Sequence, residues 1–502
     1  MNPFKRLASQ TAIYGLPTII GRLLNYLLVP LYTYNFSTSE YGTVNEMYAY
    51  VSFLLIILTY GMETALFNFS VRSENKDRVY STILVCVGMT SAVFIAGLWF
   101  FSQPIATLIR YPHHPEYIIW FGLVLGLDAI SSIAFAKLRE QQKPKTFAAI
   151  KTLNIVVNIF FNLFFIVYCK HQFEQSQASW VRSFYSPEIG IGYIFISNVI
   201  ASAVTLLVQI PSFLRVFSPL QRGAGGIWDF SLLKTILLYA LPLLVAGLAG
   251  MTNETMDRIL LKYLLPADVA LQQNGIYGAC YKISIIMTIF IQTFRYAAEP
   301  FFFSHSAEKD ARSVYARVMN YFVIICLVIF LGTWMNISWI QYFIGADFRA
   351  GISVVPILLL ANFCLGVFLN LSIWYKLTDT TKWGAYLTIT GAVITLIGNF
   401  VFIPRFGYMA SAWTTLVCYA GMMVISYFIG NKHYPVNYDL RRFLGYVALS
   451  LLLFAFSLYL RIESNGIDII VKNLLLVLFL IIVFIFERKK LFVKKYESQD
   501  HQ

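Results

Sequence analysis

Long apolar runs separated by short polar connectors dominate the chain. An apolar stretch of about 20 residues can cross a bilayer as a helix. Fourteen such stretches are centred near residues 21, 55, 91, 127, 157, 202, 243, 288, 324, 361, 394, 419, 451 and 476. No connector exceeds about 20 residues, which leaves no room for a folded extramembrane catalytic domain. The pattern predicts an all-α polytopic membrane protein whose function lies within the membrane.

The composition excludes several other classes of protein. Hydrophobic residues make up 58% of the chain and charged residues only 13%, whereas a soluble protein carries about 25% charged residues. The net charge is +13, but the basic residues are spread over connectors, so nucleic acid is not an expected partner. The six cysteines lie in or beside apolar runs without metal-ligand spacing. We therefore expect free thiols and no metal site.

The distribution of lysine and arginine predicts the orientation. With a cytoplasmic N-terminus, 25 of these residues fall in inside segments and 8 in outside segments, the latter including Arg258 and Lys262. Cytoplasmic connectors of membrane proteins carry the excess of basic residues. We therefore expect both termini in the cytoplasm and an uncleaved first span from about Ser9 to Tyr34.

Short sequence matches indicate an internal repeat. TAIYGLPTIIGRL at 11–23 is echoed by LLYALPLLVAGLA at 237–249, and Glu63 and Glu299 each follow the glycine of a Tyr-Gly pair by 21 residues. Two further matches follow in the same order with nearly the same offset. The matches predict two parallel six-helix lobes, as in transporters that handle substrate at the repeat interface and alternate access by rocking.

This repeat divides the chain into four expected parts. They are an N-terminal lobe at 1–220, a C-terminal lobe at 221–435, two extra transmembrane helices at 436–486 and a basic cytoplasmic tail at 487–502.

Several motifs give the chain a family resemblance. They are Gly-Leu-Pro at 15–17, Ser-Glu-Tyr-Gly at 39–42, Tyr-Gly-Met-Glu-Thr-Ala at 60–65, Asp-Arg at 257–258 and Tyr-Gly at 277–278. With the fourteen predicted spans, the chain resembles the polysaccharide repeat-unit flippases, or Wzx-type exporters. These belong to the superfamily that also contains MATE drug antiporters and lipid II flippases.

The resemblance implies a non-enzymatic flippase of the bacterial inner membrane with a cationic cavity. Its substrate would be an undecaprenyl-pyrophosphate-linked oligosaccharide, such as an O-antigen, capsule or exopolysaccharide unit, and its partners membrane lipids and the polysaccharide polymerase machinery. One alternative is a MATE-like drug or lipid antiporter. A membrane-embedded glycosyltransferase or polymerase is the alternative from another class, and the short outer connectors argue against it.

Three basic residues lie within predicted spans and are candidates for substrate binding. A central lysine or arginine costs about 2.5–3.5 kcal/mol on insertion scales, so it usually faces a bundle interior or a cavity. Arg22, Lys282 and Arg295 could neutralise an anionic headgroup. The alternatives are a buried ion pair for Arg22, snorkelling for Lys282 about a turn and a half inside its helix, and an i,i+4 pair with Glu299 for Arg295.

Asparagines form a second group of candidates. Asn154, Asn158 and Asn162 share one face of the predicted fifth helix. This stripe would bind sugar hydroxyls, or it would hydrogen-bond a neighbouring helix.

Four carboxylates are candidates for coupling to H⁺ or Na⁺ or for gating, with no other cofactor expected. Asp128 stands alone within the fourth predicted span. Glu63 and Glu299 are equivalent in the repeat and suggest helix capping or gating at the cytoplasmic side. Asp257, at the predicted outer end of the seventh helix, could hold a cation, or it could pair with Arg258 at the surface.

Overall fold

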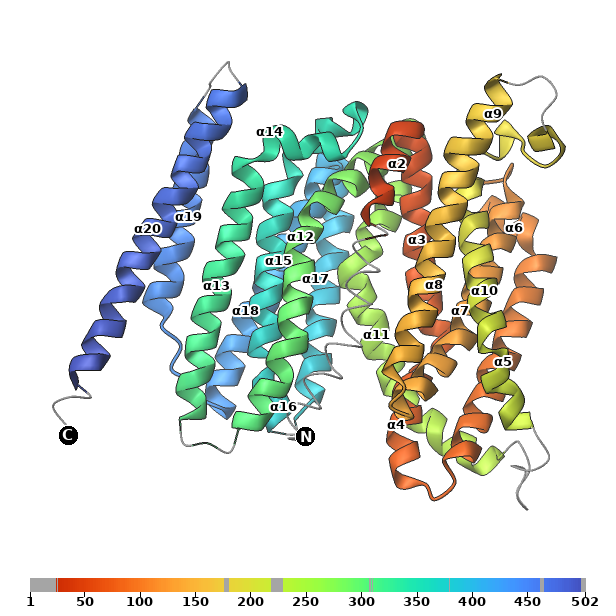
Figure 1. Ribbon diagram of the computed structural model, residues 1–502, viewed down its shortest axis with the longest axis horizontal. Helices are drawn as coiled ribbons and strands as arrows, with labels where there is room; N and C mark the ends of the chain where they lie inside the picture. The colour runs from red at the N-terminus through yellow and green to blue at the C-terminus, as the bar shows by residue number, and fades with distance from the viewer. Residues whose placement is uncertain are drawn as a thin grey trace. The chain divides into compact units, whose positions relative to one another are not determined.

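The computed structural model describes residues 24, 26–175, 180–217, 229–306, 308, 310–378, 380–460 and 465–497. Across these residues every regular element is helical, which confirms the predicted all-α class. The chain forms two compact units, Met1–Gly275 and Ile276–Gln502. Within each unit the long helices run side by side (Figure 1).

The first unit contains thirteen described elements and the start of α12. They are α2 (Leu28–Asn35), α3 (Thr38–Thr59), α4 (Met62–Arg72), α5 (Lys76–Phe100), α6 (Ser102–Leu108), α7 (Pro115–Glu140), α8 (Pro144–Leu163), the π-helical η1 (Phe164–Cys169), α9 (Lys170–Gln175), the 3₁₀ turns η2 (Trp180–Ser183) and η3 (Pro187–Ile189), α10 (Gly192–Phe217), α11 (Phe230–Leu264) and the first residues of α12 (Ala267–His305).

The second unit continues α12 and ends with two helices that extend the bundle. Its other described elements are α13 (Ala311–Met335), α14 (Ile337–Ile340), the 3₁₀ turns η5 (Gln341–Phe343) and η6 (Ala346–Gly351), α15 (Val354–Leu371), α16 (Ile373–Leu377), α17 (Lys382–Phe406), α18 (Tyr408–His433), α19 (Leu440–Tyr459) and α20 (Asn465–Glu497).

The described residues contain 13 helices long and apolar enough to span a membrane. Each coincides with one of the expected spans from the second to the fourteenth. The first expected span lies mostly outside the described residues. The domain boundaries drawn from the repeat remain a prediction, because they describe a duplication rather than packing; α11, for example, packs along α3 within the first unit.

Local sequence explains where α3 begins and ends. Ser37 and Glu40 form a reciprocal capping box, in which each side chain accepts a hydrogen bond from the backbone N–H of the other. The span is then interrupted at Tyr60 and Gly61, which both adopt positive φ angles of 30° and 75°. A glycine tolerates this conformation readily. The break places Glu63 in the first turn of a separate helix, α4.

Small and branched side chains let the spans approach closely. On α7, Leu125, Ala129 and Ile133 recur every fourth residue and are buried against α5. A Cβ atom at Gly42 would overlap the carbonyl oxygen of Leu271, so α3 and α12 meet there backbone to backbone. Close approach at glycine is a common way to pack membrane helices.

In the second unit the two C-terminal helices attach to α13. Trp334 donates through its indole N–H to Ser457 of α19 at 3.1 Å. Asn336 and Asn473 of α20 exchange side-chain amide hydrogen bonds at 3.1 and 3.0 Å. These polar contacts hold α19 and α20 against α13, where Figure 1 shows them in blue.

Candidate substrate and coupling sites

The candidate cations of α12 lie far apart. Thirteen residues separate Lys282 from Arg295 in one continuous helix, which corresponds to about 20 Å along the axis. One phosphate group cannot contact both side chains. The helix also begins at Ala267, so half-buried Lys282 lies about four turns inside it instead of the expected turn and a half. Arg22, the third candidate, lies outside the described residues.

Arg295 belongs to a cluster of two cations around one carboxylate. The Nε–H of Arg295 donates to Oε1 of Glu299 at 3.2 Å. The ammonium of Lys376, on α16, donates to the same oxygen at 2.7 Å. The i,i+4 pair expected as an alternative is therefore present, but a second cation joins it. If all three groups are ionised, the cluster carries a net charge of +1.

Asn370 completes this cluster with a buried donor. Its residue is only 6% exposed, and its Nδ2 has no hydrogen-bond partner among the described residues. Asn370, Arg295, Glu299 and Lys376 all line a small cavity of about 10 Å³, enough for one water molecule. Every nitrogen of these amide, guanidinium and ammonium groups is a hydrogen-bond donor and none is an acceptor. This arrangement suits an anion at the mouth of the cavity.

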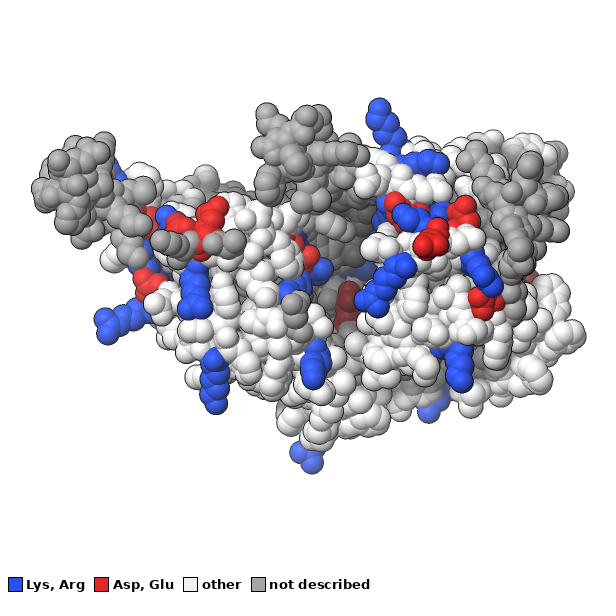
Figure 2. All heavy atoms as spheres, turned by 90° about the horizontal axis from the view of Figure 1, so that it is seen from below, with Lys and Arg blue, Asp and Glu red and all other residues white. Residues whose placement is uncertain are grey.

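The repeat-equivalent carboxylate has a different environment. Glu63 pairs with Nη2 of Arg139, on α7, at 2.7 Å. Its i−4 position is Thr59, where the second copy has Arg295. In this pair one carboxylate therefore meets one guanidinium, and their charges cancel. On the face seen in Figure 2, basic and acidic side chains lie close together, without one continuous basic patch.

The asparagine stripe of α8 faces α10. Asn154 donates to the hydroxyl of Thr205 at 2.9 Å. Asn158 donates to Asn198 at 2.7 Å, and Asn198 in turn donates to the hydroxyl of Tyr48 at 2.6 Å. The stripe thus takes part in interhelical hydrogen bonds, as in the alternative stated above.

Asp128 lies half-buried on α7 within the same polar region. The hydroxyl of Ser202 and the positive charge of Lys151 both act on its carboxyl group. The ammonium of Lys151 lies 4.3 Å from the ring centroid of Phe135. Asp128 therefore faces one hydroxyl and one cation inside the unit. It could exchange a proton or hold a monovalent cation.

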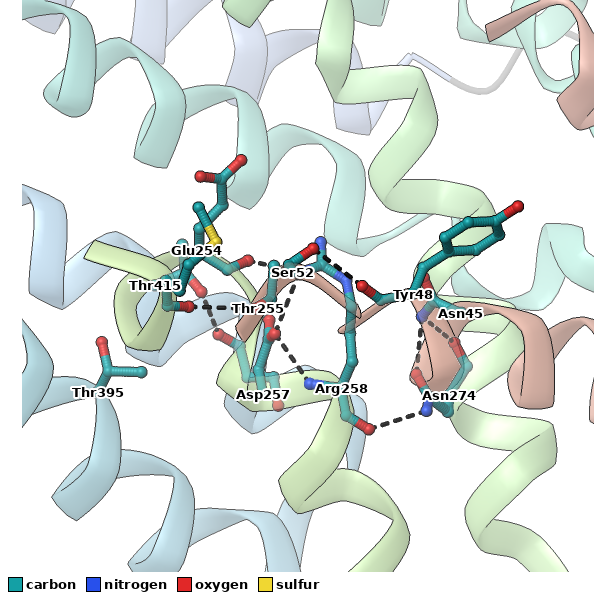
Figure 3. A network of polar contacts seen from close by, with 12 residues as sticks. Asn45, Tyr48, Ser52, Glu254, Thr255, Asp257, Arg258, Asn274, Thr395 and Thr415 are labelled. Atoms are coloured by element: carbon teal, nitrogen blue, oxygen red, sulfur yellow. Dashed lines mark hydrogen bonds and ion pairs between the residues drawn. The ribbon is translucent and has the colours of Figure 1, made fainter. Parts of the chain in front are cut away.

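Asp257 is buried with its neighbour Arg258. Their residues are 4% and 7% exposed, and a guanidinium nitrogen lies 3.5 Å from the carboxylate. The same guanidinium contacts the carbonyl oxygen of Glu254. Figure 3 shows Asn274 donating to the carbonyl of Arg258 and receiving a bond from Asn45. The expected surface pair is therefore an interior one, held by α3 and α12.

Sequence reasoning missed a second buried ion pair in the first unit. Lys262, assigned above to an outer connector, lies in α11 and is 4% exposed. Its ammonium is 3.0 Å from Glu46 of α3 and donates to the carbonyl of Ile109 at 2.6 Å. Glu46 also accepts from Tyr111, whose pKa burial raises well above its usual range. A charged residue just before a helix end carries no sequence signal that tells burial from exposure.

The described residues hold no cluster of three or more His, Cys, Asp or Glu side chains suited to a metal. The six cysteines are buried free thiols. The donor-rich cluster at Arg295 and the polar region at Asp128 are the candidate sites, one in each unit.

Comparison with known proteins places this geometry in a family. A sequence model described as "Polysaccharide biosynthesis protein" matches residues 7–306. No curated protein sequence matches the chain. Among solved structures, lipid II flippase MurJ in an inward closed conformation gives a TM-score of 0.69 at 14% identity, covering 95% of this chain and 99% of that one.

Two multidrug transporters have the same fold. An inward-facing MATE transporter of the MOP superfamily gives a TM-score of 0.63 at 12% identity, over 85% of this chain and 97% of that one. The transporter DinF-BH in complex with R6G gives 0.59 at 15% identity, over 85% and 96%. The chain therefore belongs to the polysaccharide biosynthesis protein family and has the fold shared by MurJ and the MATE transporters.

Proposed function

We propose that the protein is a flippase that moves an oligosaccharide linked to a polyprenyl diphosphate across the bacterial inner membrane. The observation that carries the proposal is the cluster in which Arg295 and Lys376 share the Glu299 carboxylate, with the amide of Asn370 in the same cavity. It offers donors and a net positive charge on membrane helices, where an uncompensated charge is costly. The membership of the polysaccharide biosynthesis family supports a glycan as cargo.

The chemistry of the cluster suits a phosphate oxygen. A guanidinium can bind phosphate bidentately through its terminal nitrogens, whereas an ammonium acts as a point charge. The one hydrogen bond that Arg295 gives Glu299 comes from its Nε. Glu299 would hold both cations in place when no substrate is bound and share them when a diphosphate arrives. The protein would contribute binding and conformational change, without covalent catalysis.

Coupling to an ion gradient would take place at Asp128. A carboxylate within a membrane span beside Ser202 and Lys151 can take up a proton, or bind Na⁺ through its oxygens. Loss of its negative charge would change its attraction for Lys151, and with it the contacts between α7 and α8. This gives an energetic link between the ion and helix packing. The coupling ion is H⁺ or Na⁺.

A reconstitution experiment tests the proposal. Proteoliposomes would contain a fluorescent oligosaccharide on undecaprenyl diphosphate, and a membrane-impermeant reductant would bleach label that reaches the outer leaflet. We expect bleaching to rise with protein content. The same glycan on an uncharged polyprenol should move only at the rate of protein-free vesicles. Equal movement of both lipids would remove the cationic cluster from substrate binding.

The alternative function is a MATE-like export of drugs or other lipids. The observation that favours it is that this chain matches two multidrug transporters in fold over 97% and 96% of their lengths. A drug exporter needs no diphosphate site, so it should translocate a cationic dye and ignore the labelled lipid.

A further inference from the structure

A pocket of about 290 Å³ lies at one end of the first unit, apart from both sites described above. Its wall is formed by the end of α2, the start of α3, the α9 turn and the segment from Tyr185 to Tyr193. Among its lining residues are Asn35, Glu40, Lys170 and Glu174. The volume is near the lower limit of small-molecule sites.

Tyr185 forms part of the wall of this pocket. Its residue is 8% exposed, and its ring stacks on Tyr193 with centroids 4.8 Å apart and planes 10° apart. The hydroxyl has no hydrogen-bond partner among the described residues. Burial raises the pKa of Tyr185 to about 12. A protonated phenol can both donate and accept a hydrogen bond.

Glu40 presents a fixed acceptor. Its Oε2 accepts from the backbone and the hydroxyl of Ser37, both at 2.8 Å, as part of the helix cap. Its other oxygen, Oε1, points toward Gly190. It lies 3.9 Å from the position that a Cβ atom on Gly190 would occupy. Gly190 has a φ of +50° and leaves that space open. One oxygen therefore anchors the carboxylate and the other lies at the pocket.

Lys170 and Glu174 add a donor and an acceptor on one helix face. They are spaced i,i+4, yet no ion pair within 4.0 Å joins them among the described residues. The half-buried ring of Phe173 lies between them along the chain and also lines the pocket. With Glu40, Lys170 and Glu174 ionised, these charges sum to −1. The guanidinium of Arg182, 5.3 Å from the ring centroid of Phe173, brings the sum around the pocket to zero, which suits an uncharged ligand.

We propose that this pocket binds one sugar residue of the transported glycan. A sugar hydroxyl both donates and accepts, so it can pair with carboxylate, ammonium and phenol groups at once. Its apolar ring face can contact Phe173. The inference rests on the proposed function for the source of the sugar. By the predicted topology the pocket lies on the outer side, where it would meet the glycan as it leaves.

Sugar binding can be measured without transport. The full chain would be placed in lipid nanodiscs, because glycoside detergents would compete for the pocket. Saturation-transfer NMR would follow N-acetyl-D-glucosamine, D-galactose and D-mannose, with inorganic phosphate as the anionic probe. The variants are Tyr185→Phe, which keeps the stacked ring, and Glu174→Gln. Glu188→Gln is the matched control, since Glu188 is exposed on η3 and does not line the pocket.

We expect at least one sugar to bind saturably and phosphate not to bind at the pocket. Each pocket variant should weaken sugar binding roughly three- to tenfold, the effect of one hydrogen bond, and the control should not. The inference is overturned if no sugar binds or if the pocket variants bind like the control. Transport of the labelled lipid without sugar binding would reject this pocket alone, whereas sugar binding without transport would reject the flippase function alone.

Discussion

At the scale of single residues, one position differs in charge between the two predicted repeats, where both copies have a carboxylate paired with a base. Glu63 and Glu299 are equivalent in the predicted repeat, and each pairs with a base from another helix at 2.7 Å. Arg295 adds a second cation only in the later copy, where the first has Thr59. The carboxylate is thus a shared structural element, and the extra cation is the specialised one.

The cationic cluster gives the first prediction. Arg295→Gln and Lys376→Gln should each slow translocation of the diphosphate-linked lipid roughly 10- to 100-fold, because each removes a hydrogen bond to a charged group. The rate is measured in proteoliposomes with matched protein content. Arg139→Gln, which removes the base that pairs with Glu63 in the first unit, is the control and should have a smaller effect. Equal losses in all three variants would point to structural damage instead of substrate binding.

Asp128 gives the second prediction. Asp128→Asn keeps the side-chain shape and a partner for Ser202 but removes the titratable charge. Translocation should become independent of imposed H⁺ and Na⁺ gradients, while exchange without a gradient continues. The measurement compares rates with and without each gradient. A variant that still responds like the wild type would exclude Asp128 as the coupling residue.

At the scale of elements, the ion pair of Glu46 and Lys262 joins α3 to the end of α11. Both residues are almost completely buried, at 0% and 4% exposure. A buried pair adds little net stability, but removal of one partner leaves an uncompensated charge. The packing of α3 against the end of α11 therefore depends on the presence of both charges.

Thermal unfolding in nanodiscs tests this pair. Lys262→Met should lower the stability of the protein by about 3–5 kcal/mol, because the Glu46 carboxylate would remain buried without its cation. The double variant Glu46→Gln with Lys262→Met should recover most of that loss. If the double variant is no more stable than the single one, the pair does not couple the two helices.

The elements themselves were largely predictable, whereas their contacts were not. Hydropathy alone located the 13 described spans because each must be about as long as the hydrocarbon core is thick. It could not show that Lys376 meets Glu299, or that Lys262 is buried, because such contacts depend on which helices become neighbours. The start of α12 at Ala267 was not predicted, and in this part of the helix Gly275 permits close packing against Thr38.

At the scale of the whole molecule, the orientation in the membrane is a prediction from the charge distribution and can be tested directly. The native cysteines are buried, so single cysteines introduced at exposed sites should dominate labelling. A membrane-impermeant thiol reagent added outside intact cells should label His113→Cys and leave Glu74→Cys unlabelled until the membrane is opened. The reverse pattern would invert the predicted topology and place the sugar pocket on the cytoplasmic side.

The central claim is that the cargo is a lipid-linked glycan. The most direct measurement follows a labelled undecaprenyl-diphosphate oligosaccharide and a cationic dye in the same proteoliposomes. The flippase account predicts that the lipid changes leaflet at a rate proportional to protein content while the dye stays at the rate of protein-free vesicles. Dye export with no movement of the lipid would contradict it and establish a drug antiporter in its place.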